Sequence, residues 1–145
     1  MYGTPAISVV YAVEEALEYF EEVGVDAIVA EHYKRRDLVR AGLSAMGLKL
    51  IAADDIASPA VTAVECPEGI DPAQLRKILR EKYNIIVAGG QGKFASSTFR
   101  VGHLGAVRLM DLFTVMVGLE LALKELGADI PMGEAVKAME KMVLA

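Results

Sequence analysis

The sequence predicts an α+β domain: a small, mostly antiparallel sheet of three to four strands, with helices packed on one face. Three features of the sequence lead to this prediction. Helical patterns open and close the chain, short stretches of strand length lie between them, and a tight loop or a single helix separates those stretches. Such connections favour antiparallel neighbours, and the apolar stripes of the helices need one face of a sheet to cover.

Two helices are predicted ahead of the sheet. The first runs from about Pro5 to Val23, because Thr4 can cap it, proline suits the first helical position, and Gly24 can end it. Its apolar residues form more than one stripe, so its first half needs cover on several sides. The second helix runs from about Asp26 to Met46 and stops at Gly47.

Strands and helices then alternate along the chain. A strand is predicted at 59–66, where β-branched residues recur. Asp71 before Pro72 repeats the combination of capping side chain and proline, and starts a helix that reaches about Tyr83. The other predicted elements are strands at 48–52, 84–88 and 97–101 and helices at 106–126 and 131–144.

The composition suits one domain and argues against two kinds of partner. A chain of 145 residues, 54% of them hydrophobic, is long enough to bury a core. Its 20 acidic and 15 basic residues give a net charge of −5, the reverse of what a nucleic acid backbone attracts. The most apolar stretch, Leu109 to Leu123, contains Asp111 and Glu120 and is shorter than the roughly 20 residues of a membrane span. We therefore expect neither nucleic acid nor membrane as partner.

Cysteine and histidine suggest few chemical roles. Cys66 is the only cysteine, which together with the lack of a secretory leader predicts a cytoplasmic protein, and packing is its expected role. His32 has no partner at metal-ligand spacing, so it is expected at the surface and no metal site is predicted. His103 titrates near neutral pH and is a candidate acid or base, but its position between glycines at a turn favours a structural role.

The glycine-rich segment Gly89–Lys93 has the composition of a phosphate-binding loop. That motif, however, requires glycine six residues before the lysine and Ser or Thr after it, where this sequence has Val87 and Phe94. The segment is therefore predicted to be a loop between two strands.

Arg100 lies at the end of the short hydrophobic strand that follows this loop, beside glycines that leave space. An arginine in this position can offer its planar fork to a carboxylate through two parallel charge-assisted hydrogen bonds. Composition alone favours an ordinary surface or salt-bridged arginine, so both interpretations stay open at this point.

The residues that follow carry a resemblance to a known family. Residues 99–105 read FRVGHLG and, with Asp111 and the LELAL sequence at 119–123, resemble the closing segment of class V aminotransferases, notably the alanine–glyoxylate and serine–pyruvate group. Similar segments upstream are TPAI at 4–7, SPAVTAV at 58–64 and IVAGG at 86–90. The resemblance covers essentially the whole chain, and the glycine turn with the arginine motif is its most specific part.

This resemblance implies a place in a larger enzyme. It identifies 1–145 as one domain, the small domain of fold-type I pyridoxal-phosphate enzymes, with 1–23 as an interdomain-type helix and 24–145 as the C-terminal small domain. The large cofactor-binding domain is then absent. Arg100 would bind the α-carboxylate of the substrate. Thr4, and with it Tyr2, would reach the cofactor phosphate of the neighbouring subunit in a homodimer, although helix capping explains Thr4 equally well.

The implied reaction transfers an amino group from a small amino acid, alanine or serine, to a 2-oxo acid, glyoxylate or pyruvate. Transamination needs a lysine that forms a Schiff base with pyridoxal phosphate, and none of the eight lysines here lies in the context of the family's cofactor lysine. We therefore expect no catalytic residue in this chain, no covalently bound cofactor and no activity from it alone. The alternative is a stand-alone partner-binding or structural domain without catalytic activity.

Overall fold

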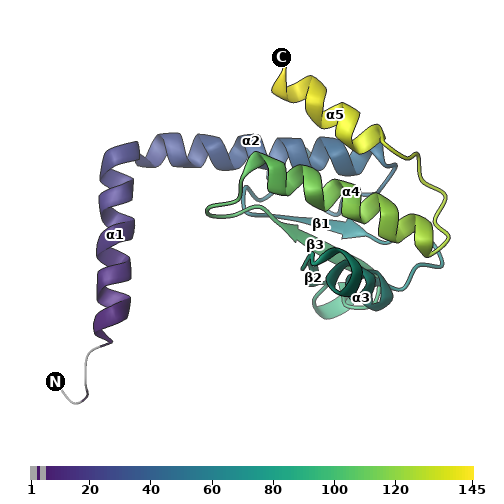
Figure 1. Ribbon diagram of the computed structural model, residues 1–145, viewed down its shortest axis with the longest axis horizontal. Helices are drawn as coiled ribbons and strands as arrows, with labels where there is room; N and C mark the ends of the chain where they lie inside the picture. The colour runs from purple at the N-terminus through teal and green to yellow at the C-terminus, as the bar shows by residue number, and fades with distance from the viewer. Residues whose placement is uncertain (1–2, 4–5) are drawn as a thin grey trace. The chain divides into compact units, whose positions relative to one another are not determined.

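The computed structural model describes Gly3 and residues 6–145. The chain divides into two compact units, Met1–Glu31 and His32–Ala145. The first unit contains helix α1 (Ile7–Val23), and helix α2 (Val25–Ala45) begins in the first unit and continues into the second. The second unit holds the sheet and the remaining helices, as Figure 1 shows.

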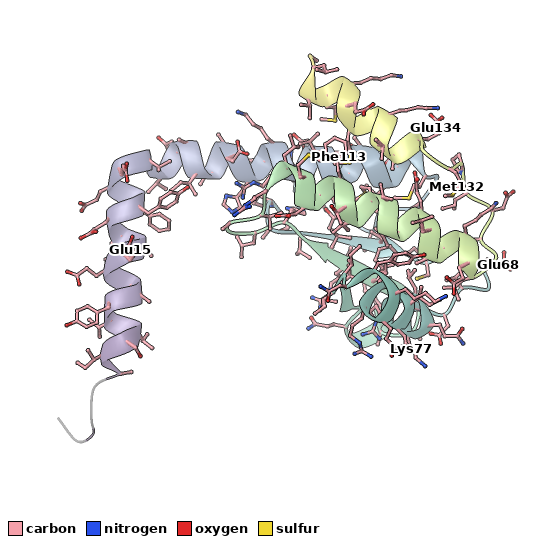
Figure 2. All side chains as sticks on the ribbon, viewed as in Figure 1. Glu15, Glu68, Lys77, Phe113, Met132 and Glu134 are labelled. Atoms are coloured by element: carbon pink, nitrogen blue, oxygen red, sulfur yellow. The ribbon has the colours of Figure 1, made fainter. Side chains whose placement is uncertain are left out.

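Helix α1 ends where the sequence predicts. Gly24 takes a positive φ of 85° and donates its N–H to the carbonyl of Phe20, 3.0 Å away. The helix begins at Ile7, and the predicted start at Pro5 and cap at Thr4 lie outside the described residues. Every residue of α1 is exposed, and Figure 2 shows its side chains, Glu15 among them.

Three short strands form one antiparallel sheet in the order β1-β3-β2. They are β1 (Val61–Glu65), β2 (Ala88–Gly89) and β3 (Thr98–Gly102). Because β3 is the central strand, its residues Phe99 and Arg100 each pair with both β1 and β2. The α+β class and the small antiparallel sheet predicted from the sequence are confirmed.

Two predicted strands are wrong in extent. The segment 48–52 makes only an isolated bridge between Leu50 and Val64, because the chain turns away into a 3-10 helix at Asp54–Ile56 soon after it. The start of the segment 84–88 is bonded to α3 instead of pairing in the sheet. The Ile85 amide donates to the Leu79 carbonyl, 2.9 Å away, so regular pairing starts only at Ala88.

The helices pack on the face of the sheet that carries Phe99 and Val101. Helices α3 (Pro72–Tyr83), α4 (Leu109–Glu125) and α5 (Glu134–Val143) lie within three residues of their predicted ends. Asp71 caps α3 as predicted, accepting the Ala73 amide at 2.8 Å. The core consists mainly of Val39 and Leu43 from α2, Val64 from β1, Leu75 and Leu79 from α3, Phe99 and Val101 from β3, Met116, Leu119 and Leu123 from α4, and Met139 from α5.

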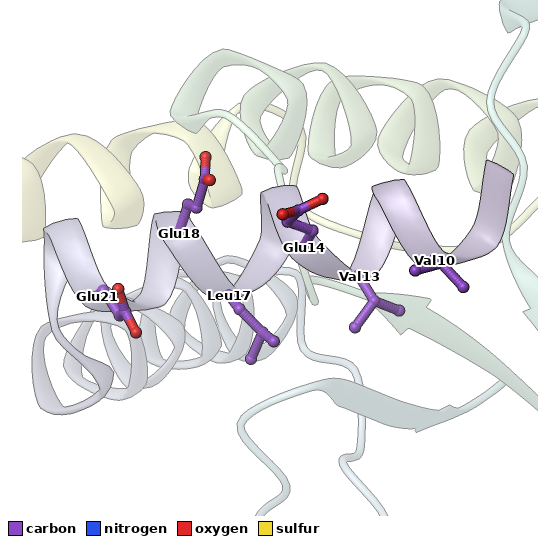
Figure 3. Close-up of a pocket in the computed structure, with 6 residues that line it drawn as sticks. All are labelled: Val10, Val13, Glu14, Leu17, Glu18 and Glu21. Carbon is purple, nitrogen blue, oxygen red and sulfur yellow. The ribbon is translucent and has the colours of Figure 1, made fainter. Parts of the chain in front are cut away.

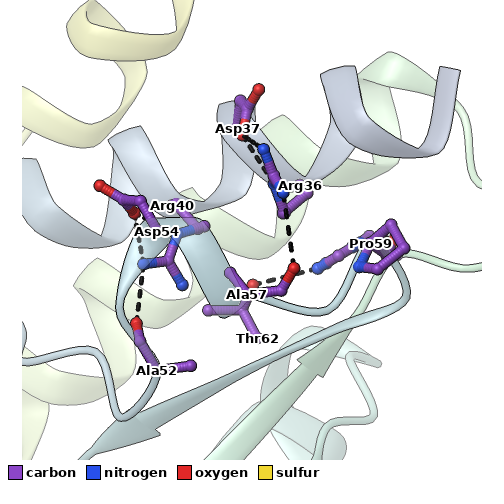
Figure 4. A network of polar contacts seen from close by, with 9 residues as sticks. Arg36, Asp37, Arg40, Ala52, Asp54, Ala57, Pro59 and Thr62 are labelled. Atoms are coloured by element: carbon purple, nitrogen blue, oxygen red, sulfur yellow. Dashed lines mark hydrogen bonds and ion pairs between the residues drawn. The ribbon is translucent and has the colours of Figure 1, made fainter. Parts of the chain in front are cut away.

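Two buried charges anchor the outer parts of this unit. Glu120 of α4 accepts the backbone amides of Gly133 and Ala135 at 2.9 and 3.2 Å, so its carboxylate caps the start of α5. Arg40 of α2 binds the Asp54 carboxylate and donates to the Ala52 carbonyl at 2.9 Å, which holds the start of the 3-10 helix at Asp54–Ile56 (Figure 4).

Among the described helices, none is both long and apolar enough to cross a bilayer.

Candidate functional site

Arg100 lies in the middle of the sheet, on the face opposite Phe99 and Val101. Its cross-strand partners are Ala63 on β1 and Ala88 on β2. Its side chain is half-buried, and its Nε donates to the Gly89 carbonyl at 2.8 Å. Among the residues that the structure describes, no carboxylate pairs with Arg100. The described residues therefore give the terminal nitrogens of its fork no carboxylate partner.

The neighbours of Arg100 leave its guanidinium approachable. Ala63 and Ala88 flank it with single methyl groups, and neither alanine is buried. Sequence reasoning identified Arg100 by residue type but missed these two alanines, because their contact with it depends on pairing between distant strands. The alternation of Phe99 and Val101 around Arg100 was the one available signal, since alternate residues of a strand face opposite sides.

The glycine-rich segment shapes the hairpin that supports Arg100. A Cβ on Gly90 would lie 2.1 Å from the Phe94 carbonyl oxygen and 2.2 Å from Thr98 Oγ1, so only glycine fits there. The Gly90 amide donates to the Thr98 carbonyl at 2.9 Å, and Thr98 Oγ1 donates to the Phe94 carbonyl at 2.9 Å. The segment forms a loop between β2 and β3, as predicted, and Gly89, whose carbonyl holds Arg100, is the last residue of β2 before it.

His103 lies inside the second unit, fully buried, on the face opposite Arg100. Its Nδ1 is 3.0 Å from the Pro59 carbonyl and its Nε2 is 3.0 Å from Thr62 Oγ1. Since a carbonyl only accepts, Nδ1 carries the proton and Nε2 accepts from the Thr62 hydroxyl. Burial lowers the pKa of His103 below its ordinary value of 6.5. His103 is therefore a neutral imidazole in the core that makes two hydrogen bonds. This is the structural role that its position between glycines favours.

His32, expected at the surface, is partly covered and makes a hydrogen bond there. It is half-buried, and its Nε2 accepts the Gly105 amide at 3.1 Å, while Arg35 on the next turn of α2 donates to the Gly105 carbonyl. The two side chains of α2 therefore hold both polar groups of one glycine. Sequence reasoning missed this contact because its partners are 73 residues apart. Within the described ranges, no three His, Cys, Asp or Glu residues gather as a metal site would require.

Cys66 is half-buried at the end of β1. Burial raises the pKa of its thiol to about 11, the nearby Asp71 carboxylate raises it too, and Arg76 opposes them. The thiolate needed for nucleophilic use is therefore scarce at neutral pH. This environment agrees with the packing role expected from the sequence.

The described lysines lie at the surface. All eight are exposed, and Lys49 and Lys137 pair with Glu65 and Glu134 at 2.7 and 2.6 Å. The hydrogen bond that Lys137 donates to the Glu134 carboxylate raises the pKa of Lys137, whereas Schiff-base formation needs a neutral amine. Tyr2 and Thr4, the residues expected to reach the cofactor phosphate, lie outside the described part of the chain.

Known proteins resemble this chain over nearly all of its length. The pattern of the class V aminotransferase family matches residues 1–130. An uncharacterized aminotransferase of Methanocaldococcus jannaschii is 41% identical over 127 residues, which are 88% of this chain and 33% of that protein. The serine–glyoxylate aminotransferase of Arabidopsis thaliana is 34% identical over 136 residues, 93% of this chain and 34% of that protein.

A solved structure agrees with these relatives. The ureidoglycine–glyoxylate aminotransferase of Bacillus subtilis superposes with a TM-score of 0.94 and 31% identity, covering 99% of this chain and 37% of that one. The chain thus spans about a third of the length of the relatives it matches. With a family match over residues 1–130 and relatives above 30% identity, the chain belongs to the class V family of pyridoxal-phosphate-dependent aminotransferases.

Proposed function

We propose that this chain forms the substrate-carboxylate-binding, C-terminal small domain of an aminotransferase that moves an amino group from a small amino acid, alanine or serine, to glyoxylate or pyruvate. The observation that carries the proposal is the state of Arg100. Its Nε is held by the Gly89 carbonyl at 2.8 Å, and among the described residues no carboxylate neutralises it. Amino donor and 2-oxo acid acceptor both carry a carboxylate beside the reacting carbon, so one arginine serves both halves of the reaction.

The bond to Gly89 prepares the fork for this role. A guanidinium anchored through Nε keeps its two terminal nitrogens on one edge, where they match the two oxygens of a carboxylate. The side chain loses less conformational freedom on binding when it is held in advance. Ala63 and Ala88 on either side add no bulk that would block a planar anion.

The proposal assigns α1 to the contact with the rest of such an enzyme. Val10, Val13 and Leu17 form an apolar row along α1, with Glu14 and Glu18 beside it (Figure 3), and each of the three apolar residues is more than half exposed. Contiguous exposed apolar surface of this kind marks a surface that binds other protein. In this proposal α1 is the interdomain-type helix, and the Schiff-base lysine belongs to a large domain that the 145 residues do not include.

The proposal also covers Tyr2 and Thr4, which would reach the cofactor phosphate of the neighbouring subunit in a homodimer. When bound, pyridoxal phosphate supplies the electron sink for the reaction. The described residues offer it no buried lysine, so the contribution proposed for this chain is to bind and orient the substrate through Arg100.

Titration with pyruvate, followed by NMR of the isotope-labelled chain, tests the proposal. We expect saturable shifts of the Arg100 Nε–H and of the amides of Gly89 and Ala63. Pyruvamide, which has no carboxylate, serves as the matched control ligand at the same ionic strength. Arg100→Gln should abolish the pyruvate shifts while the spectrum stays folded. Equal responses to pyruvate and pyruvamide would contradict the proposal.

The absence of a catalytic lysine is tested separately. The purified chain is incubated with pyridoxal phosphate, reduced with borohydride and digested, and the peptides are analysed by mass spectrometry. We expect only slow, scattered labelling of exposed lysines and no amino transfer to glyoxylate or pyruvate. A single lysine labelled at stoichiometric level, accompanied by turnover, would refute the assignment of the cofactor lysine to a large domain. The alternative, a stand-alone partner-binding or structural domain, would keep Arg100 merely as an anion contact and predicts a chain that stays monomeric in dilute solution.

A further inference from the structure

His103 makes three polar contacts with one short stretch of chain. Its ring binds the Pro59 carbonyl and Thr62 Oγ1, each at 3.0 Å, and its backbone N–H donates to the Ala60 carbonyl at 2.9 Å. Pro59 and Ala60 directly precede β1, Thr62 lies in it, and His103 directly follows β3. Figure 4 shows Pro59 and Thr62 close to the polar network below α2. One residue thus ties the end of β3 to the start of β1.

These contacts fix which residue of β1 lies opposite Arg100. The last regular pair is Val61 with Gly102, and two residues earlier in β3 the pairing sets Ala63 against Arg100. A slip by one residue would place Thr62 or Val64 opposite Arg100 instead. Either is β-branched and larger than alanine, and a slip by one residue also turns every side chain of the strand to the other face. The open space beside Arg100 therefore depends on this register.

We propose that His103 is a positioning residue for Arg100, acting from the opposite face of the sheet through the β1–β3 register. The inference rests on the proposed carboxylate-binding function and deepens it. The imidazole suits the task because it donates at Nδ1 and accepts at Nε2, and so one rigid ring satisfies the part-buried Pro59 carbonyl and the buried Thr62 hydroxyl. Loss of the ring would remove these partners from the part-buried Pro59 carbonyl and from the buried Thr62 hydroxyl.

The turn beyond His103 is held as well. His32 Nε2 accepts the Gly105 amide at 3.1 Å, and Arg35 donates to the Gly105 carbonyl. These bonds keep the segment after β3 against α2, so His103 is held from both sides and has little freedom to follow a shifted strand. The register is thereby fixed at the end of the β1–β3 pair that holds Val61 and Gly102.

The test compares two substitutions of His103 with one control in the full 145-residue chain. His103→Phe keeps a planar ring and removes both hydrogen bonds. His103→Asn places an amide N–H near the position of Nδ1 and can keep the bond to Pro59. Glu120→Gln removes a buried charge from the capping contact with α5, in a different part of the core, and controls for a general loss of stability. All proteins are measured under conditions where their unfolding curves show them fully folded.

Two readouts are taken for each protein: cross-strand nuclear Overhauser effects between residues 63 and 100, and the affinity for pyruvate. For His103→Phe we expect weaker or displaced 63–100 contacts and about tenfold weaker pyruvate binding. His103→Asn should recover most of both, and Glu120→Gln should change neither.

The outcomes separate the inference from the proposed function. If His103→Phe keeps the 63–100 contacts and binds pyruvate as the unchanged chain does, the inference is overturned while the function stands. If Arg100→Gln binds pyruvate undiminished, the proposed function fails, and the 63–100 contacts still decide whether His103 sets the register. If Glu120→Gln weakens the 63–100 contacts and pyruvate binding as much as His103→Phe does, His103 acts only as a stabilising core residue, and the inference is also overturned.

Discussion

Arg100 Nε and the Gly89 carbonyl oxygen lie 2.8 Å apart across the β2–β3 pair. This bond joins the side chain proposed to bind the substrate carboxylate to the neighbouring strand β2. Arg100→Lys tests the importance of this bond. Lysine keeps the charge but has neither the planar fork nor an Nε to bind Gly89. We expect pyruvate affinity to fall about tenfold, or about 1.4 kcal/mol, in an NMR titration. Unchanged affinity would mean that charge alone suffices.

Gly90 should be intolerant of substitution. A Cβ there would lie 2.1 Å from the Phe94 carbonyl oxygen, and backbone cannot move aside as a flexible side chain can. Gly90→Ala is therefore expected to lower the free energy of unfolding by about 1–3 kcal/mol in urea denaturation. Gly102→Ala is the matched control, because nothing lies within 4 Å of its added methyl group. Equal effects of the two substitutions would contradict the steric argument.

The sequence predicted the helices better than the site, for physical reasons. Asp71 with Pro72 and Gly24 are local signals, and the helices they bound formed as expected. Strand length at 48–52 and 84–88 was misjudged because pairing depends on distant residues: Ile85 is held by Leu79 of α3 instead of by the sheet. For the same reason Arg100 was identified by type, whereas its alanine neighbours and the contact of His32 with Gly105 were not.

Glu120 should contribute to stability through its contact with α5. Its carboxylate is buried and accepts the amides of Gly133 and Ala135. Glu120→Gln removes the charge and turns an amide N–H₂ toward a donor, so we expect a loss of about 1–3 kcal/mol in the free energy of unfolding. Glu125→Gln on the same helix removes a carboxylate from an exposed ion pair with Lys82 and should change the unfolding midpoint little. A larger effect at Glu125 would contradict this ranking.

Stability should fall at mildly acidic pH because of His103. Burial lowers its pKa in the folded chain below 6.5, and the facing groups of α2, namely His32, Arg36 and Arg35, lower it further. The unfolded chain then binds the proton more readily, so the free energy of unfolding decreases as the pH falls below 6.5, until the lowered pKa of the folded form is passed. Above 6.5 this contribution is constant.

Urea denaturation between about pH 7.5 and about pH 5.5 measures this slope. His103→Asn, which has no titrating group at that position, should give a shallower dependence than the unchanged chain. Titration of the His103 ring protons by NMR should place its midpoint below 6.5. Identical slopes for the two proteins would show that other groups cause the acid sensitivity.

The exposed helix α1 should make the chain associate with itself. Val10, Val13 and Leu17 are 56%, 53% and 54% exposed and lie in one row (Figure 3). Covering such an apolar row with another surface lowers the free energy of the system. We expect the apparent mass from light scattering to rise with concentration, and the substitutions Val13→Glu and Leu17→Glu to suppress the rise. Ile86→Glu is the control, because Ile86 is 82% exposed but lies outside α1. An unchanged chain that stays monomeric at every concentration would count against α1 as a surface that the rest of the enzyme covers, since that role requires the row to be worth burying.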